Sequence, residues 1–420
     1  MTRSSYDLGM MIRTATGLTA AAIMIGSIPM AGPAFAANHG SAATCSGGNP
    51  QLAAARLGGV AGVAATSSCN AWSVGGYLPH GSFPRTLIER WNGTAWRLQR
   101  SPNPGGATVE DGLTSVAART SASAWAVGYS IYPGANSAFR GFCLHWDGKA
   151  WKQVPSVAVD GELLGVAVTP HSHAWAVGFA YVKVHRHFYE RTFIEHWNGR
   201  VWRQTPSKNP GGPQRTDELS SVAVTSATDA WAVGSYRTGP DSPSRNLIEH
   251  WNGTAWKVVA SPNFTSPANR PGPNSLRGVT AISPSDAWAV GTYPDTEAGT
   301  FQALVLHWNG KTWSRATNPS AGRSELVSVA SAGPSDVWAV GNYTQPGARG
   351  SFPPTQILIE HWNGSGWQVT APPIDSLTHW LSTVAATSAS DVWAIGQTCT
   401  QLFGRCTFIS MKVATATLVK

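Results

Sequence analysis

A ten-residue phrase, LIEHWNGTAW at residues 247–256, recurs with small changes and is present six times in this chain of 420 residues. A second phrase, LSSVAVTSATDAWAVG at residues 219–234, occurs seven times. Its tryptophans, 50 to 57 residues apart, are Trp72, Trp125, Trp175, Trp231, Trp288, Trp338 and Trp393. A period of this length is typical of propellers and solenoids, in which each repeat is one supersecondary unit. The repetition therefore predicts one large array, although the length alone would suggest two or three domains.

Each repeat is predicted to contain four strands. In the fourth repeat these cover residues 219–226, 229–236, 247–251 and 255–262, and the first strand has small, alternating apolar residues. An Asn-Gly pair, the strongest short hairpin signal, joins the third strand to the fourth and predicts a type I′ turn. We expect Trp251 and Trp256 to lie diagonally on one face of this hairpin.

The lengths of the four joins differ in a systematic way. The spacing from the first apolar residue of the first strand to the tryptophan of the second is always 12, and that from the third-strand to the fourth-strand tryptophan is always 5. The second-to-third join and the join to the next repeat vary, with spacings of 19 to 24 and 12 to 20. In an antiparallel meander the two variable joins lie at one end, here called the variable face, and the two constant joins at the other, the constant face. Variable loops on a rigid scaffold usually carry binding.

These features predict an all-β fold, a seven-bladed β-propeller of four-stranded antiparallel blades that occupies residues 57–420 as a single domain. Six or eight blades, or a linear solenoid, are the alternatives. The seventh repeat is degenerate: we align Thr407–Lys420 with Thr192 onward, which puts Lys412 in the place of a tryptophan. Whether the ring closes with this C-terminal strand or with residues 50–57 is left open.

The phrase DVWAVGNY, followed by LIEHWNGSGWQVTAPP, resembles a kelch-type blade, and it is more similar to the tectonin-type repeat with its Trp-Asn-Gly hairpin. It also resembles uncharacterised exported propellers of actinobacteria that carry LIEHWNGTAW phrases. The resemblance covers roughly residues 57–412, and the single glycine after the second strand departs from the Gly-Gly pair of kelch repeats. The tectonin likeness implies sugar binding, as an analogy only.

The N-terminus has the pattern of an export signal. Arg3 and Arg13 precede an apolar run, and small residues at 34 and 36 predict cleavage after Ala36. Residues 1–36 are therefore expected to be a signal peptide, residues 37–56 a partly disordered segment, and the mature protein secreted, monomeric and without a transmembrane segment.

The five cysteines suit an exported protein with disulfides. Cys399 and Cys406 bracket a short loop and form the favoured pair, while Cys45 with Cys69 is a second candidate. Cys143 takes the place of Ile194 in the next repeat, so we expect a buried small side chain.

Two recurrent polar positions receive structural interpretations. The acid that opens the second strand, as at Asp229, is expected to be a turn residue rather than part of an acidic ring. The histidine before the third-strand tryptophan, as at His250, occurs in five repeats, one to a blade, is replaced by Arg90 and Met411 in the other two, and is also expected to be structural. No metal site and no cofactor are predicted, because histidines placed on separate blades do not converge.

The candidate ligand-binding residues lie in the variable joins. The segment YVKVHRHFYERT at 181–192 is the outlier, interpreted as a second-to-third loop that either contacts a ligand or is simply solvated. Its basic side chains are Lys183, His185, Arg186, His187 and Arg191, and further candidates elsewhere on the variable face are Arg215, Arg237, Arg245, Arg270, Arg323 and Arg349.

The sequence lacks a nucleophile elbow, a phosphate loop and an HExxH motif, so the interpretation leans against an enzyme. The favoured function is an exported, non-catalytic propeller for a glycan or an anionic cell-envelope polymer, because the formal charge is +8. An extracellular protein-interaction scaffold is the alternative, followed by a glycan-active hydrolase or lyase. No nucleic-acid partner is expected.

Overall fold

The structure is a computed structural model that describes residue 45 and the ranges 58–80, 82–133, 138–157, 159–169, 172–265, 274–294, 301–319, 322–344, 355–370, 378–399 and 406–413. The side chains of Thr378 and Cys406 are not among those described. Within these ranges, no helix has the length and hydropathy of a membrane span.

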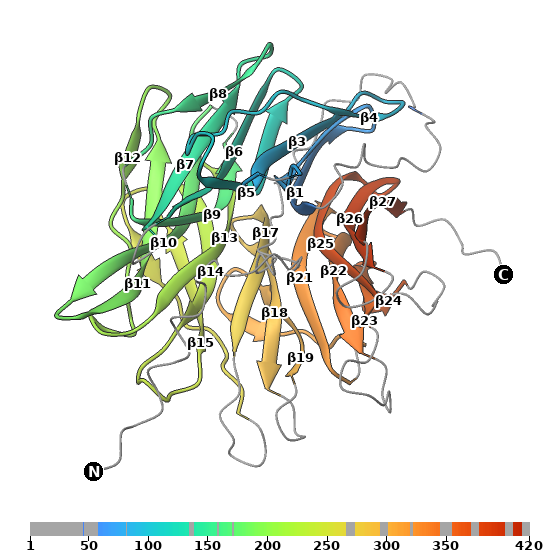
Figure 1. Ribbon diagram of the computed structural model, residues 1–420. Helices are drawn as coiled ribbons and strands as arrows, with labels where there is room; N and C mark the ends of the chain where they lie inside the picture. The colour runs from blue at the N-terminus through green and yellow to red at the C-terminus, as the bar shows by residue number, and fades with distance from the viewer. Residues whose placement is uncertain are drawn as a thin grey trace.

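The described residues form seven antiparallel sheets with strands in chain order (Figure 1). The innermost strands are β1 (Gly58–Ser67), β5 (Glu110–Thr120), β9 (Gly161–Val168), β13 (Asp217–Ser226), β17 (Ser275–Ser283), β21 (Ser324–Gly333) and β25 (Thr378–Ser388). The second strands are β2 (Asn70–Tyr77), β6 (Ser123–Tyr132), β10 (Ala174–Val184), β14 (Asp229–Tyr236), β18 (Asp286–Pro294), β22 (Asp336–Thr344) and β26 (Asp391–Cys399).

The outer half of each sheet is formed by the third and fourth strands. The third strands are β3 (Arg85–Trp91), β7 (Ala138–Trp146), β11 (His187–Trp197), β15 (Arg245–Trp251), β19 (Phe301–Trp308), β23 (Thr355–Trp362) and β27 (Cys406–Val413). The short fourth strands are β4 (Trp96–Leu98), β8 (Trp151–Val154), β12 (Trp202–Gln204), β16 (Trp256–Val258), β20 (Trp313–Arg315) and β24 (Trp367–Val369). The fourth strand expected for the last repeat falls in residues 414–420, which lie outside the described part.

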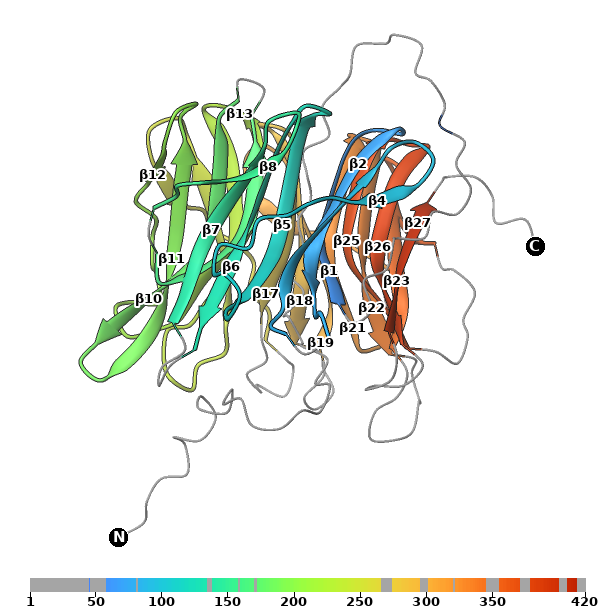
Figure 2. The same cartoon turned by 45° about the horizontal axis from the view of Figure 1, so that its top comes forward.

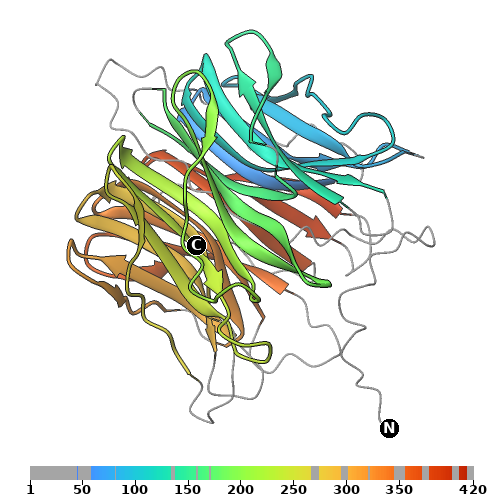
Figure 3. The ribbon, with the colours of Figure 1, turned by 90° about the vertical axis from the view of Figure 1, so that its left-hand side faces the viewer.

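The seven sheets close into a ring. Each innermost strand contacts that of the next blade, and β25 contacts β1. Figures 1, 2 and 3 accordingly show the blue first blade beside the red last one. The chain is a seven-bladed β-propeller. The predicted fold class is confirmed, and the strands described for the last blade all come from the C-terminal part of the chain.

The repeated tryptophans hold neighbouring blades together. Trp231 on β14 is fully buried and packs against Trp308 and Trp313 of the next blade, with ring centroids 4.9 Å and 5.2 Å away. The same arrangement closes the ring, because Trp393 of the last blade lies 5.2 Å from Trp91 and 5.3 Å from Trp96 of the first. Buried aromatic pairs of this geometry add stabilisation beyond the area that they bury. The recurrent phrases are therefore structural.

The glycine that ends the AWAVG phrase meets a steric requirement. A Cβ at Gly234 would lie 2.0 Å from the carbonyl oxygen of Glu218, where β13 changes register between Leu219 and Ser221. The β-bulge brings the backbones too close for any side chain.

The hairpin between third and fourth strands differs from the prediction. Trp251 and Trp256 lie directly opposite each other, not diagonally, with four residues between them. Gly253 has a φ of +90°, whereas Asn252 is not among the described residues with positive φ. The Asn252 Oδ1 accepts hydrogen bonds from the Thr254 and Ala255 amides at 3.1 Å and 3.0 Å. The type I′ assignment was wrong, because the side chain of the asparagine closes the loop and only the glycine needs positive φ.

The acid of the second strand has a different role from the one predicted. Asp229 accepts a hydrogen bond from the His250 Nε2 at 2.7 Å and another from the Thr225 hydroxyl, instead of capping a turn. The His250 ring in turn packs on Trp231, with centroids 4.2 Å apart. Asp286–His307 and Asp336–His361 repeat the pair at 2.9 Å and 2.7 Å. The structural interpretation of the histidines is therefore supported.

The alignment of the last repeat needs a correction of one residue. In the register of β26 and β27, Lys412 lies opposite Trp393, as His250 lies opposite Trp231, and Val413 takes the tryptophan position. Lys412 Nζ lies 3.2 Å from the Asp391 carboxylate and 4.8 Å from the Trp393 ring centroid. The lysine thus replaces a histidine, because the Trp-cation-acid contact determines the register.

Buried glutamates on the third strands of the third and fourth blades connect each of these blades to the loop before it. Glu249 is fully buried and accepts hydrogen bonds from the Ser207 hydroxyl at 2.8 Å and the Lys208 amide at 3.2 Å. Glu195 accepts from the Cys143 thiol at 3.2 Å and the Val157 amide at 3.0 Å. Burial raises the pKa of both glutamates to about 7, although these hydrogen bonds oppose the rise.

The cysteines are distributed as expected where the structure describes them. Cys45 and Cys69 form a disulfide with a Cα–Cα distance of 5.4 Å, and Cys143 is a buried free thiol. Cys399 lies directly opposite Cys406 in the backbone register. Because the Cys406 side chain is outside the described part, the favoured Cys399–Cys406 pair stays a prediction.

Candidate functional site: the variable face

The antiparallel order of every sheet places the variable joins at one end of the ring, as the constant and variable spacings imply. This end points downward in Figure 2. The two ends differ because the constant joins are tight turns, whereas the variable joins can change in length without disturbing the blades.

The segment 181–192 was expected to be a loop, and this expectation is wrong. It forms the outer part of a β-hairpin in which β10 and β11 pair from Ala174↔Trp197 to Val184↔His187. Only His185 and Arg186 remain in the turn, and His185 has a φ of +57°. Alternating β-branched and aromatic residues favour strand pairing here. The hairpin projects past the neighbouring blades (Figures 1 and 2).

The tip of this hairpin is basic and partly apolar. Lys183, His185, Arg186 and His187 are exposed. The Lys183 Nζ lies 5.8 Å from the ring centroid of Phe188, whose side chain is 41% exposed.

Two of the predicted ligand-binding arginines donate hydrogen bonds to loop carbonyls, and the bond of Arg191 supports the loop that follows the third blade. Arg191 is half-buried and donates a hydrogen bond to the Gly212 carbonyl at 3.1 Å. Arg215 is half-buried and donates to the Gln214 carbonyl. In the first blade, Arg85 donates to the Gly106 and Ala107 carbonyls at 2.5 Å and 3.0 Å. The duplicated phrase Ser-x-Asn-Pro-Gly-Gly, at 101–106 and 207–212, is the sequence signal for this support.

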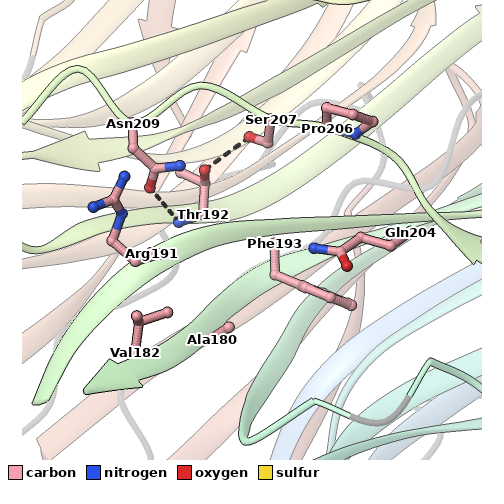
Figure 4. A pocket seen from close by; sticks show the side chains of 9 residues that line it. All are labelled: Ala180, Val182, Arg191, Thr192, Phe193, Gln204, Pro206, Ser207 and Asn209. Carbon is pink, nitrogen blue, oxygen red and sulfur yellow. Dashed lines mark hydrogen bonds between the residues drawn. The ribbon is translucent and has the colours of Figure 1, made fainter. Parts of the chain in front are cut away.

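The same loop builds the wall of a cleft on the third blade. Figure 4 shows Thr192 between Asn209, which accepts its backbone N–H at 2.9 Å, and Ser207, whose hydroxyl donates to its side chain at 2.8 Å. The open cleft of about 620 Å³ is lined by Ala180, Val182, Arg191, Thr192, Phe193, Gln204, Pro206, Ser207 and Asn209. A cleft that mixes apolar walls with amide and guanidinium groups can hold a polar organic ligand.

The remaining candidates are spread around the variable face. Arg237 and Arg245 are exposed beside the β14–β15 join, and Arg323 is exposed with its guanidinium 4.9 Å from the Phe301 ring centroid. Arg270 and Arg349 lie outside the described residues. Among the candidates that the structure describes, the exposed cations therefore lie on the third and fourth blades, apart from Arg323 on the sixth, and do not all meet at one point.

Carboxyl groups lie among these cations. Burial raises the pKa of Glu190 to about 7; the negative charge of Glu218 adds to the rise and Arg237 opposes it. Burial likewise raises the pKa of Asp217 to about 6, against the opposing effects of the Gly211 amide and Arg191. Among the described residues, no three His, Cys, Asp or Glu side chains come together in a way that could hold a metal ion.

Comparison with known proteins finds structural likeness but no sequence relative. The sequence matches no protein-family model and no curated protein. An ulvan lyase of polysaccharide lyase family PL25, solved with -[GlcA(1-4)Rha3S]- bound, is 10% identical and aligns over 89% of this chain and 96% of its own, with a TM-score of 0.51. YCF48 from Cyanidioschyzon merolae is 15% identical over 86% of this chain and 97% of its own, with a TM-score of 0.49. At these identities the likeness concerns the fold alone.

Proposed function

We propose that this chain is an exported, non-catalytic propeller that binds an anionic glycan or cell-envelope polymer through its variable face. The observation that carries the proposal is the set of exposed cations on the third and fourth blades, where Lys183, Arg186, Arg237 and Arg245 stand on rigid strands or their short joins. Such a surface attracts anionic polymers by long-range electrostatics. The cleft beside β11 offers a place for one residue of the polymer.

Export is supported by two features. The N-terminal segment has the pattern of a signal peptide, and the Cys45–Cys69 disulfide is of the kind that persists in oxidising compartments.

The test compares the two faces of the ring. The triple variant Lys183→Ala, Arg186→Ala, Arg245→Ala should bind polygalacturonate or teichoic acid about tenfold more weakly at low salt, because exposed charges contribute only near the ligand. The matched control replaces Lys149, Arg200 and Lys311, which are exposed in the constant-face turns.

Affinity measured against salt concentration, with neutral dextran as a further probe, decides the outcome. The proposal expects a shallower salt dependence for the variable-face variant and little change for the control. Equal losses in both variants would assign binding to bulk charge, and tight binding of dextran alone would contradict the electrostatic account.

A further inference from the structure

The hairpin formed by β10 and β11 extends beyond the rest of its blade. Its inner neighbour β9 pairs with β10 only as far as Ala180, opposite Gly161. Its outer neighbour β12 pairs with β11 only from Glu195 to Trp197. No other described strand pairs with residues 182–189, here called the hairpin tip, and Figure 2 shows the tip projecting from the ring.

The hairpin tip exposes apolar side chains on both of its faces. Val182 is 42% exposed and Phe188 is 41% exposed. Val182 lies opposite Tyr189, whereas Phe188 lies opposite Lys183, so the two apolar residues belong to opposite faces of the hairpin. A protein groove or a hydrated polymer would usually cover one face only. A medium that surrounds the tip, as the headgroup region of a bilayer does, would cover both.

Positive charge surrounds these apolar groups. The tip carries Lys183, His185, Arg186 and His187, and the sequence contains no acidic residue between Glu162 and Glu190. The Lys183 Nζ lies 5.8 Å from the centroid of the Phe188 ring, and the long lysine side chain lets the ammonium reach outward while the ring is buried. This combination is typical of segments that lie in the interface of anionic membranes.

We propose that the hairpin tip docks on an anionic phospholipid surface. Val182 and Phe188 enter the headgroup region, and Lys183 and Arg186 pair with lipid phosphates. Each such cation near an anionic bilayer strengthens binding by about fivefold. This docking is separate from the proposed polymer binding, because it needs the apolar side chains as well as the charges.

The test is vesicle flotation of the purified protein with phosphatidylglycerol mixed into phosphatidylcholine. We expect binding to the mixed vesicles and little to phosphatidylcholine alone. The variant Val182→Ser, Phe188→Ser should bind about tenfold more weakly, because it loses both apolar groups and keeps every charge. The milder Phe188→Leu should retain binding.

A matched control keeps the test specific. Val258 and Val369 lie on fourth strands and are 46% and 45% exposed, so Val258→Ser, Val369→Ser removes two exposed apolar side chains elsewhere. The proposal would be overturned if the variant Val182→Ser, Phe188→Ser floated with the vesicles as well as the wild type does. It would also be overturned if the wild type did not bind the mixed vesicles. Polygalacturonate binding should be unchanged in the single variant Phe188→Ser, because Phe188 does not line the cleft proposed for the polymer. Loss of polygalacturonate binding in this variant would mean that one site binds both the polymer and the lipid surface. A protein that binds vesicles but not the polymer would refute only the proposed function.

Discussion

Single residues decide whether each turn can form. Gly253 is the clearest case, because its φ of +90° lies in the left-handed region and a Cβ there would lie 3.1 Å from the Thr228 side chain. Gly253→Val should lower the free energy of unfolding by about 1–3 kcal/mol, because a β-branched residue adopts positive φ at high cost. Chemical denaturation measures the effect. Ala255→Val in the same turn is the control, and an equal loss there would contradict the backbone explanation.

The buried glutamates give the stability a dependence on pH. The pKa of Glu249 is about 7 in the folded protein, above its usual value of 4.5. The folded state therefore binds more protons between these values, and the free energy of unfolding falls as pH rises through this range. Glu249 contributes up to about 3 kcal/mol to the free energy of unfolding. This contribution is fully present below the unfolded pKa and is lost by about pH 8.

Glu249→Gln tests this assignment, because the amide keeps the shape of the side chain and cannot ionise. Urea unfolding at about pH 5 and about pH 8 should show a smaller difference in the variant than in the wild type. Glu195→Gln should behave alike, since burial raises its pKa to about 7 as well. An unchanged slope in both variants would place the pH dependence elsewhere.

At the scale of strands, the same kind of polar contact joins the second and third strands of six blades, whereas in the third blade the rings of His173 and His196 pack together with centroids 5.1 Å apart. An acceptor at the start of the second strand binds a basic side chain that lies over the tryptophan. Arg90 donates to Asn70 at 3.0 Å in the first blade, and Lys412 pairs with Asp391 in the last. Comparison of the repeats with one another could have found the pair, because both positions recur at a fixed distance from the repeated tryptophans.

The last blade offers a test of this device. Lys412→Ala should destabilise the protein by about 3 kcal/mol, because it leaves the buried Asp391 carboxylate, 4% exposed, without its cation. Lys412→His should restore much of the loss, since histidine fills the same register position in five other blades. Thermal unfolding compares the variants, and equal losses for alanine and histidine would argue against the ion pair.

At the scale of the whole molecule, the cysteines mark the place where the ring closes. Cys45 is bonded to Cys69 in the β1–β2 turn, and a Cβ at Gly93, in the next constant-face turn, would lie 2.7 Å from the Cys45 Sγ. Cys45 is thus attached at the constant face. Cys399 and Cys406 belong to the last blade, beside the first.

Non-reducing digestion and mass spectrometry should therefore recover two linked pairs, Cys45 with Cys69 and Cys399 with Cys406. Burial raises the pKa of the Cys143 thiol well above its usual value, so alkylation of Cys143 should require unfolding. Reduction of the second pair should cost little stability, because the loop that it closes is short. Free thiols at Cys399 and Cys406 in the exported protein would show that this disulfide does not form.

The sequence by itself determined the number of blades, the four-strand repeat and the division into a constant and a variable face. These properties follow from local periodicity and turn residues, which repeat every 50 to 57 residues and need no knowledge of neighbours. The exposed basic character of residues 183–187 could also be predicted, because the cations are adjacent in the chain.

Only the tertiary structure decided which cationic side chains are exposed and how neighbouring blades pack against each other. No local pattern shows that Arg191 donates to the Gly212 carbonyl, because the loop at 207–212 must first fold back against it. Trp231 meets Trp308 of the following blade, and Trp393 meets Trp91 across the ring closure. These contacts join residues far apart in the chain, so no local pattern contains them. The free energy of burying them arises only when the ring is closed.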